Sequence, residues 1–270
     1  MINSLGLGGG GMKGILHIGA LLELQKHQKL FFKDGIFGCS IGSIIATWIA
    51  FEIPLQNIKL IVDGYFKSEL FFEKFHPDHI INLFSKNGAY SMDTLRNLLI
   101  KLFAEVGLNI ADKKLQDAHM PLKIVASNLT KGIPTIFEKN ISVLDAICCS
   151  CAFPGIFQPQ TLYKQMYIDG YFFTPCLSQL FPDAMVFSLR TDFVTQNNNI
   201  LSYTSLIFAN VIKQLHDKQK NHNTICLSYP ELSSSSDLSK FNIDDIFKVA
   251  AEQLQKRIIV NEVTEIKNDV

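Results

Sequence analysis

The sequence has no excess charge of either sign and no long uninterrupted apolar run. Its 270 residues hold 25 Lys and Arg against 25 Asp and Glu, and this balance argues against a nucleic-acid partner. The most membrane-like stretch, residues 36–51, is broken by Gly, Ser and Thr. It is also shorter than the roughly 20 apolar residues of a transmembrane helix. The first residues show no basic segment followed by an apolar run, so we expect no signal peptide and a cytoplasmic or peripheral-membrane location.

The sequence also lacks the paired spacings typical of metal sites and disulfide frameworks. Three of its six cysteines lie close together in C-C-S-C at residues 148–151, and no C-x-x-C or H-x-x-x-H pattern occurs elsewhere. Because no secretory signal is predicted, we expect the cysteines to be buried, reduced thiols. We predict no metal site.

Glycine, by contrast, is concentrated near the start of the chain. An apolar segment at residues 2–7 predicts a buried strand, G-G-G-G-M-K-G follows at residues 8–14, and apolar residues then recur at helical spacing. Two overlapping G-x-G-x-x-G matches suggest a dinucleotide site. That site requires an acidic residue at the end of the second strand, whereas Asp34 lies at its start. A phosphate-binding P-loop is disfavoured because Ile15 and Leu16 follow Gly14.

A third interpretation of the glycines is an oxyanion hole, in which the N–H groups of Gly9, Gly10 and Gly11 point at a negative oxygen. It is supported by the next strand, at about residues 34–39, which runs into G-C-S-I-G at residues 38–42. This pattern is typical of a nucleophile elbow with Ser40 at its tip. Both turns would then lie at the same edge of a parallel sheet. The simpler alternative is that Ser40 only caps a helix.

A histidine base for Ser40 is not evident. His17 lies on the first predicted helix among apolar residues, which favours a packed or capping histidine. The other histidines stand in polar or helical contexts, and none follows a strand with glycine around it: His27, His76, His79, His119, His216 and His222.

Residues 55–120 are predicted to form a helical flap or lid. The flap is rich in aromatic residues: Tyr65, Phe66, Phe71, Phe72, Phe75 and Phe84. Two interpretations stay open, a flap packed by its own aromatics and an exposed apolar lid that meets lipid. Beyond it we expect a strand at 121–127 with a hairpin partner at 133–137, a helix that begins at Ser142, and a strand that ends in Asp169-Gly170.

Four segments in this order resemble the patatin-like phospholipases: the glycine loop, the serine elbow, A-F-P-G-I-F-Q-P at residues 152–159 and I-D-G-Y at residues 168–171. The similarity covers residues 5–182, and residues 183–270 are expected to complete the same fold without adding chemistry. The resemblance implies an α/β three-layer sandwich with a central, mostly parallel sheet flanked by helices. It also implies a serine lipid acyl hydrolase that acts on phospholipid or related lipid esters and needs no organic cofactor.

The resemblance assigns roles to residues as well. It makes Ser40 the nucleophile and Asp169 the base of a Ser–Asp dyad, with Gly9, Gly10 and Gly11 as the oxyanion hole. Lys13 stands where the family carries a basic residue. Three interpretations of Lys13 stay open: it assists catalysis by its charge, it binds a lipid phosphate, or it is simply solvated. The remaining motif positions are Gly14, Gly38, Gly42 and Gly170.

One departure from the family pattern concerns Tyr171, which replaces the usual small residue after Asp169-Gly170. A bulky side chain there raises a second hypothesis, a weakly active or non-enzymatic member of the fold that binds lipid or membranes. Transient contact with a membrane surface is expected in both cases, and whether a protein activator is needed stays open.

Overall fold

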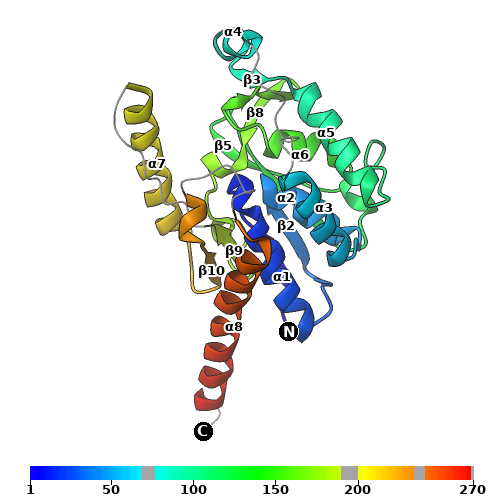
Figure 1. The fold of residues 1–270 in the computed structure, drawn as a ribbon, viewed down its shortest axis with the longest axis vertical. Helices are drawn as coiled ribbons and strands as arrows, with labels where there is room; N and C mark the ends of the chain where they lie inside the picture. The colour runs from blue at the N-terminus through cyan, green and yellow to red at the C-terminus, as the bar shows by residue number, and fades with distance from the viewer. Residues whose placement is uncertain (68–76, 190–199, 234–240, 269–270) are drawn as a thin grey trace.

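The computed structural model describes residues 1–67, 77–189, 200–233 and 241–268 (Figure 1). Three phenylalanines of the predicted flap, Phe71, Phe72 and Phe75, and His76 lie outside the described residues. None of the helices within the described ranges is both long enough and apolar enough to cross a bilayer.

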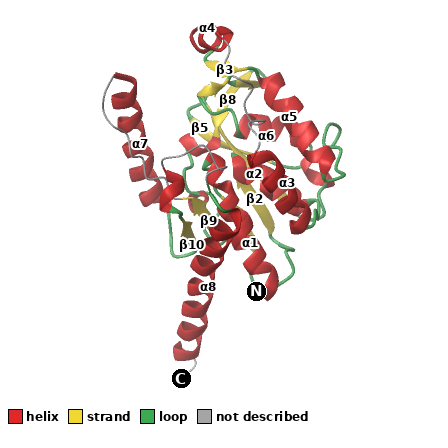
Figure 2. Cartoon of the chain, in the orientation of Figure 1, coloured by secondary structure: helices red, strands yellow, loops and turns green. Residues whose placement is uncertain are grey.

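A sheet of eight strands forms the centre of the molecule, in the order β10-β9-β1-β2-β4-β8-β7, with β5 paired to β4 (Figure 2). Its strands are β1 (Ser4–Leu7), β2 (Gly35–Cys39), β4 (Leu122–Asn128), β5 (Ile133–Phe137), β7 (Gln160–Leu162), β8 (Gln165–Asp169), β9 (Met185–Leu189) and β10 (Thr224–Leu227). The pairs among β10, β9, β1, β2 and β4 are parallel, and those of β4 with β5 and β8 are antiparallel.

Helices flank the sheet and bury its apolar strands. They are α1 (Ile15–His27), α2 (Ile41–Ala50), α3 (Leu55–Lys67), α4 (Pro77–Ser85), α5 (Met92–Glu105), α6 (Val143–Ser150), α7 (Ile200–Gln219) and α8 (Ile243–Asn268). Every residue of β2 is buried, as expected for a parallel strand covered on both faces. The long helix α8 packs along α1 (Figure 1). The predicted α/β architecture, with a mostly parallel sheet flanked by helices, is confirmed.

The edge of β4 brings two strand ends together. β4 pairs with β5 through residues 124–128, so its other edge must hold both β2 and β8. On that edge β2 pairs in parallel up to Cys39 opposite Val125, and β8 pairs antiparallel with Asp169 opposite Ala126. The carboxyl ends of β2 and β8 therefore meet head to head at adjacent residues of β4.

The predicted flap divides into a buried and an exposed part. Ser91 is the N-cap of helix α5, and its hydroxyl accepts a hydrogen bond from Thr94 N–H at 3.2 Å. Helix α5 buries its apolar face in the core. Helix α4 instead packs on the short strand β3 (Gly88–Tyr90), which pairs with β6 (Gly155–Phe157). It exposes large apolar side chains: Ile80, Ile81, Leu83 and Phe84.

The cysteines follow the prediction with one correction. None forms a disulfide, and five are buried: Cys39, Cys148, Cys149, Cys151 and Cys176. Cys226 is exposed, contrary to the expectation of a buried thiol. It lies on β10, an edge strand of the sheet that is only partly covered.

Candidate active site

Ser40 occupies a strained turn between β2 and α2. Its φ of 53° and ψ of −128° lie outside the regions that L-residues normally adopt. The turn is tightly packed, because a β-carbon at Gly42 would lie 2.0 Å from the Leu7 carbonyl oxygen and one at Gly38 would lie 2.4 Å from Ser43 Cα. The glycines of the elbow are thus required by close backbone approach.

Two serine side chains hold the backbone of Ser40. The Ser43 hydroxyl donates to the Ser40 carbonyl oxygen at 2.6 Å, and the Ser40 N–H donates to Ser150 Oγ at 2.8 Å. Ser150 in turn donates to the Val125 carbonyl oxygen at 2.6 Å. These contacts fix the elbow on both sides of the serine.

Asp169 lies directly against Ser40. Ser40 Oγ donates to Asp169 Oδ2 at 2.5 Å, and the backbone N–H of Tyr171 donates to Oδ1 at 2.9 Å. The carboxyl is 1% exposed. Burial raises its pKa from 3.8 to about 7, although the hydrogen bonds from Ser40 and Tyr171 oppose that rise. The structure therefore joins a hydroxyl to a carboxyl that changes protonation near neutral pH.

The glycine loop lies beside this pair. A β-carbon at Gly9 would lie 3.1 Å from Ser40 Cβ and 3.3 Å from Tyr171 Cβ. The backbone of Gly9 hydrogen-bonds to the Cys39 thiol, and Gly8 N–H donates to Phe187 O at 2.9 Å. Within the described residues, the N–H groups of Gly10 and Gly11 donate to no protein acceptor. These two N–H groups remain available at the loop.

The other motif residues surround the same point. Lys13 is half-buried in the short helix η1 (Gly11–Gly14), and its N–H donates to Gly10 O at 3.3 Å. A β-carbon at Gly14 would lie 2.3 Å from Ile41 Cγ1, so this glycine lets the loop approach the elbow helix. At Gly170 a β-carbon would lie 2.4 Å from the Val125 carbonyl oxygen.

Two buried histidines are engaged away from Ser40. His17 is packed as predicted: its Nε2 lies 2.8 Å from Gly8 O, and burial lowers its pKa to about 4. The ring is therefore neutral, and Nε2 is the donor to the carbonyl. His216 contacts Ser188 Oγ at 2.7 Å, a pairing that the sequence did not indicate. Because Ser188 is 1% exposed, this serine–histidine pair is closed to a substrate.

Sequence analysis missed Ser43, Ser150 and Cys39 as neighbours of the Ser40–Asp169 pair. The available signal was a polar serine on an otherwise apolar helical stretch at residues 146–151. Burial, followed by the nearby Asp169 charge, raises the pKa of both Cys39 and Cys151 well above the ordinary thiol value. These thiols stay protonated at neutral pH and are unreactive.

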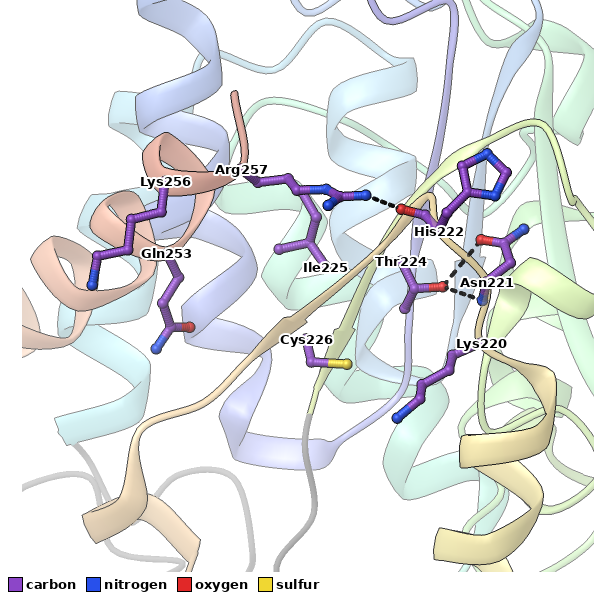
Figure 3. A pocket seen from close by; sticks show the side chains of 9 residues that line it. All are labelled: Lys220, Asn221, His222, Thr224, Ile225, Cys226, Gln253, Lys256 and Arg257. Atoms are coloured by element: carbon purple, nitrogen blue, oxygen red, sulfur yellow. Dashed lines mark hydrogen bonds between the residues drawn. The ribbon is translucent and has the colours of Figure 1, made fainter. Parts of the chain in front are cut away.

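A separate cavity of about 650 Å³ lies between β10 and α8 (Figure 3). Its cationic side chains include Lys220, Lys256 and Arg257, but Lys220 is already paired with Asp217 at 2.7 Å. Arg257 donates to the His222 carbonyl oxygen (Figure 3). None of the lining residues belongs to the serine site. Across the described ranges, no group of three or more His, Cys, Asp or Glu side chains is arranged to hold a metal ion.

The fold is α/β, and at the carboxyl edge of its sheet a serine on a strained turn is hydrogen-bonded to a buried carboxyl. Residues 5–178 match the family model described as patatin-like phospholipase. The chain therefore belongs to the patatin-like phospholipase family, and this membership supports lipid acyl hydrolase activity.

Similar proteins come from a virus and from bacteria. The chain is 27% identical over 215 residues to uncharacterized protein R571 of Acanthamoeba polyphaga mimivirus, covering 73% of this chain and 67% of that protein. It is 26% identical over 193 residues to the cUMP-AMP-activated phospholipase of Escherichia coli, covering 62% of this chain and 53% of the relative. The fold is similar to that of VipD from Legionella pneumophila, with a TM-score of 0.56 and 14% identity over 96% of this chain and 67% of VipD.

Proposed function

We propose that the chain is a serine lipid acyl hydrolase in which Ser40 is the nucleophile and Asp169 the base. The observation that carries this proposal is the 2.5 Å hydrogen bond from Ser40 Oγ to a buried carboxyl with a pKa of about 7. A carboxylate of ordinary pKa, about 3.9, is a poor base for an alcohol. Near neutral pH, Asp169 matches the pKa that general-base catalysis favours.

In the first step, Ser40 Oγ attacks the carbonyl carbon of a carboxylic ester while Asp169 accepts the hydroxyl proton. The ester C–O bond then breaks, and the leaving alcohol takes the proton from Asp169. In the second step, a water molecule gives a proton to Asp169 and attacks the acyl-enzyme. The bond to Ser40 Oγ breaks, Oγ recovers the proton, and the fatty acid leaves.

Both steps pass through a negatively charged oxygen that needs donors. Of the three predicted oxyanion-hole residues Gly9, Gly10 and Gly11, we propose the N–H groups of Gly10 and Gly11 as the donors. The N–H groups of Gly8 and Gly9 are engaged with the Phe187 carbonyl oxygen and the Cys39 thiol. One such donor contributes about 3 kcal/mol to lowering the barrier. Lys13, half-buried next to this loop, adds a positive charge near the developing oxyanion.

The proposed substrate is a phospholipid or another lipid ester presented at a membrane surface. Helix α4 supports such contact, because Phe84 is 83% exposed and Ile81 63% exposed. The helix stands at one extremity of the molecule, opposite the C-terminus (Figure 1). Helix α4 packs on β3, and β3 pairs with β6, which begins three residues beyond Ala152. The Ala152 carbonyl accepts the Asp169 N–H at 2.9 Å. The exposed helix is thus linked to the proposed site.

The second candidate function is lipid binding with little or no turnover. It is favoured by Tyr171, whose Cβ and Cδ2 both lie 3.3 Å from the β-carbon position of Gly9 and crowd the glycine loop. The name of the Escherichia coli relative adds a related question, because it describes a phospholipase activated by cUMP-AMP. An activator requirement for this chain is therefore part of what must be measured.

A fluorophosphonate probe separates the two functions, since only an activated serine reacts with it. We expect the wild-type chain to be labelled at Ser40, located by peptide mass spectrometry, and Ser40→Ala to be unlabelled. Labelling is measured without and with lipid vesicles and cUMP-AMP. An unlabelled wild-type chain under all these conditions supports the non-enzymatic alternative and contradicts the hydrolase.

A further inference from the structure

We propose that Ser150 is a positioning residue that holds the Ser40 elbow in register with Asp169. This inference rests on the proposed function of Ser40 and assigns a role to a side chain that does not touch the reacting atoms. Ser150 is the last residue of α6 and is fully buried.

The Ser150 hydroxyl bridges the residue after the end of β2 and the middle of β4. It accepts from Ser40 N–H at 2.8 Å and donates to Val125 O at 2.6 Å. Cys39, the residue before Ser40, is the last β2 residue in the ladder with β4, and it lies opposite Val125. The hydroxyl therefore continues the β2–β4 connection by one step, at the point where the chain turns sharply away.

A serine suits this place for a chemical reason. A hydroxyl is both a donor and an acceptor, so it can satisfy one N–H and one carbonyl at once. Val125 and Ser150 are fully buried and Ser40 is 9% exposed, so neither backbone group has ready access to water. An alanine at position 150 leaves the Ser40 N–H and the Val125 carbonyl without this partner. The backbone conformation of Ser40 is strained and persists only while its surroundings hold it.

The same turn of chain also holds the base. Two residues after Ser150, the Ala152 carbonyl accepts the Asp169 N–H at 2.9 Å. Val125 O, the acceptor for Ser150, also lies against Gly170. The end of α6 thus contacts both members of the dyad, and displacement of the elbow changes the distance between Ser40 Oγ and Asp169.

The test is Ser150→Ala in the full chain, with turnover of a chromogenic fatty-acid ester, the rate of fluorophosphonate labelling and the pH profile as readouts. We expect kcat/KM and the labelling rate to fall about 100-fold with KM little changed, as for small misplacement of reacting groups. The hydrogen bond from Ser40 lowers the Asp169 pKa, so weakening it should move the midpoint of the pH profile upward. Two titratable side chains interact with Asp169, the thiols of Cys39 and Cys151. Both thiols stay protonated across this pH range.

Ser150→Thr keeps the hydroxyl and should recover part of the activity and the original midpoint. Ser178→Ala is the matched control, because it removes another buried serine hydroxyl, one that lies 2.6 Å from Thr224 Oγ1. If Ser150→Ala does not fold, Ser150→Cys, which keeps the size but is a weak donor, takes its place. Activity and midpoint equal to those of Ser178→Ala would overturn the positioning role. Full turnover by Ser40→Ala would instead overturn the proposed function itself.

Discussion

Ser40 and Asp169 are 129 residues apart in sequence, yet Oγ of one lies 2.5 Å from Oδ2 of the other. The contact arises because β2 and β8 end head to head on one edge of β4, opposite Val125 and Ala126. The carboxyl ends of a parallel strand and of an antiparallel strand therefore lie next to each other.

Removing either member of the dyad should abolish ester hydrolysis. We expect Ser40→Ala and Asp169→Asn each to lower kcat by at least about 1,000-fold, because nucleophile and base act as one unit. The measurement is steady-state hydrolysis of a chromogenic fatty-acid ester. The control is His216→Gln, which alters the Ser188–His216 pair and should keep wild-type turnover. Loss of activity in the control together with full activity in Asp169→Asn would point to a histidine base.

The pH dependence of hydrolysis should follow the ionisation of Asp169. The base must be deprotonated, and its pKa is raised to about 7 by burial. We therefore expect kcat/KM to rise with pH through about 7 and then to level off. A profile already flat from pH 5 upward would mean that Asp169 ionises at its ordinary value.

The same ionisation should weaken the fold as pH rises. A carboxyl whose pKa is raised from 3.8 to about 7 by folding binds more protons in the folded state, so stability falls between these values and is constant above them. Asp169→Asn removes this penalty, and we expect it to gain stability over wild type by a few kcal/mol at pH 8. The gain should be smaller at pH 5, as thermal or denaturant unfolding at both pH values will show.

Gly170→Ala should damage both stability and activity. The added β-carbon would lie 2.4 Å from Val125 O and 2.8 Å from Cys39 Sγ, and the carbonyl belongs to a central strand that cannot easily move. We expect the free energy of unfolding to fall by about 3 kcal/mol. The control is Gly132→Ala, whose β-carbon meets nothing within 4 Å and whose φ of 68° costs only about 1 kcal/mol. Equal unfolding midpoints for the two variants would contradict the tight packing at Gly170.

A charge on the exposed face of α4 should separate membrane contact from catalysis. We expect Phe84→Asp to reduce sedimentation with phospholipid vesicles while hydrolysis of a soluble ester is unchanged, since the ring is 83% exposed and stabilises no core. Phe31→Asp is the control, because Phe31 is 42% exposed in the loop before β2, at the amino end of the parallel strands. If both variants bind vesicles as wild type does, α4 is not the docking surface.

Local patterns in the sequence predicted most of the elements. Apolar segments and helical periodicity indicated individual strands and helices, and Ser142 marked where α6 begins. The α/β architecture itself was implied by the resemblance of the motifs to the patatin-like family. The glycine loop, the elbow and the Asp-Gly turn identified the segments of the candidate site. The flap was less accessible, because periodicity shows that a helix is amphipathic but not whether its apolar face is covered. In the structure, α5 is covered and α4 is not.

The sequence by itself determined which residue types stand at the turns: a serine between two glycines, a loop of glycines, and an aspartate at a strand end. Only the tertiary structure decided that Asp169 reaches Ser40, that Ser150 holds the elbow and that His216 is engaged with Ser188. The reason is physical. Turn chemistry depends on a few neighbouring residues, whereas a hydrogen bond across 129 residues and a pKa raised by burial depend on strand register and on what the whole chain removes from water.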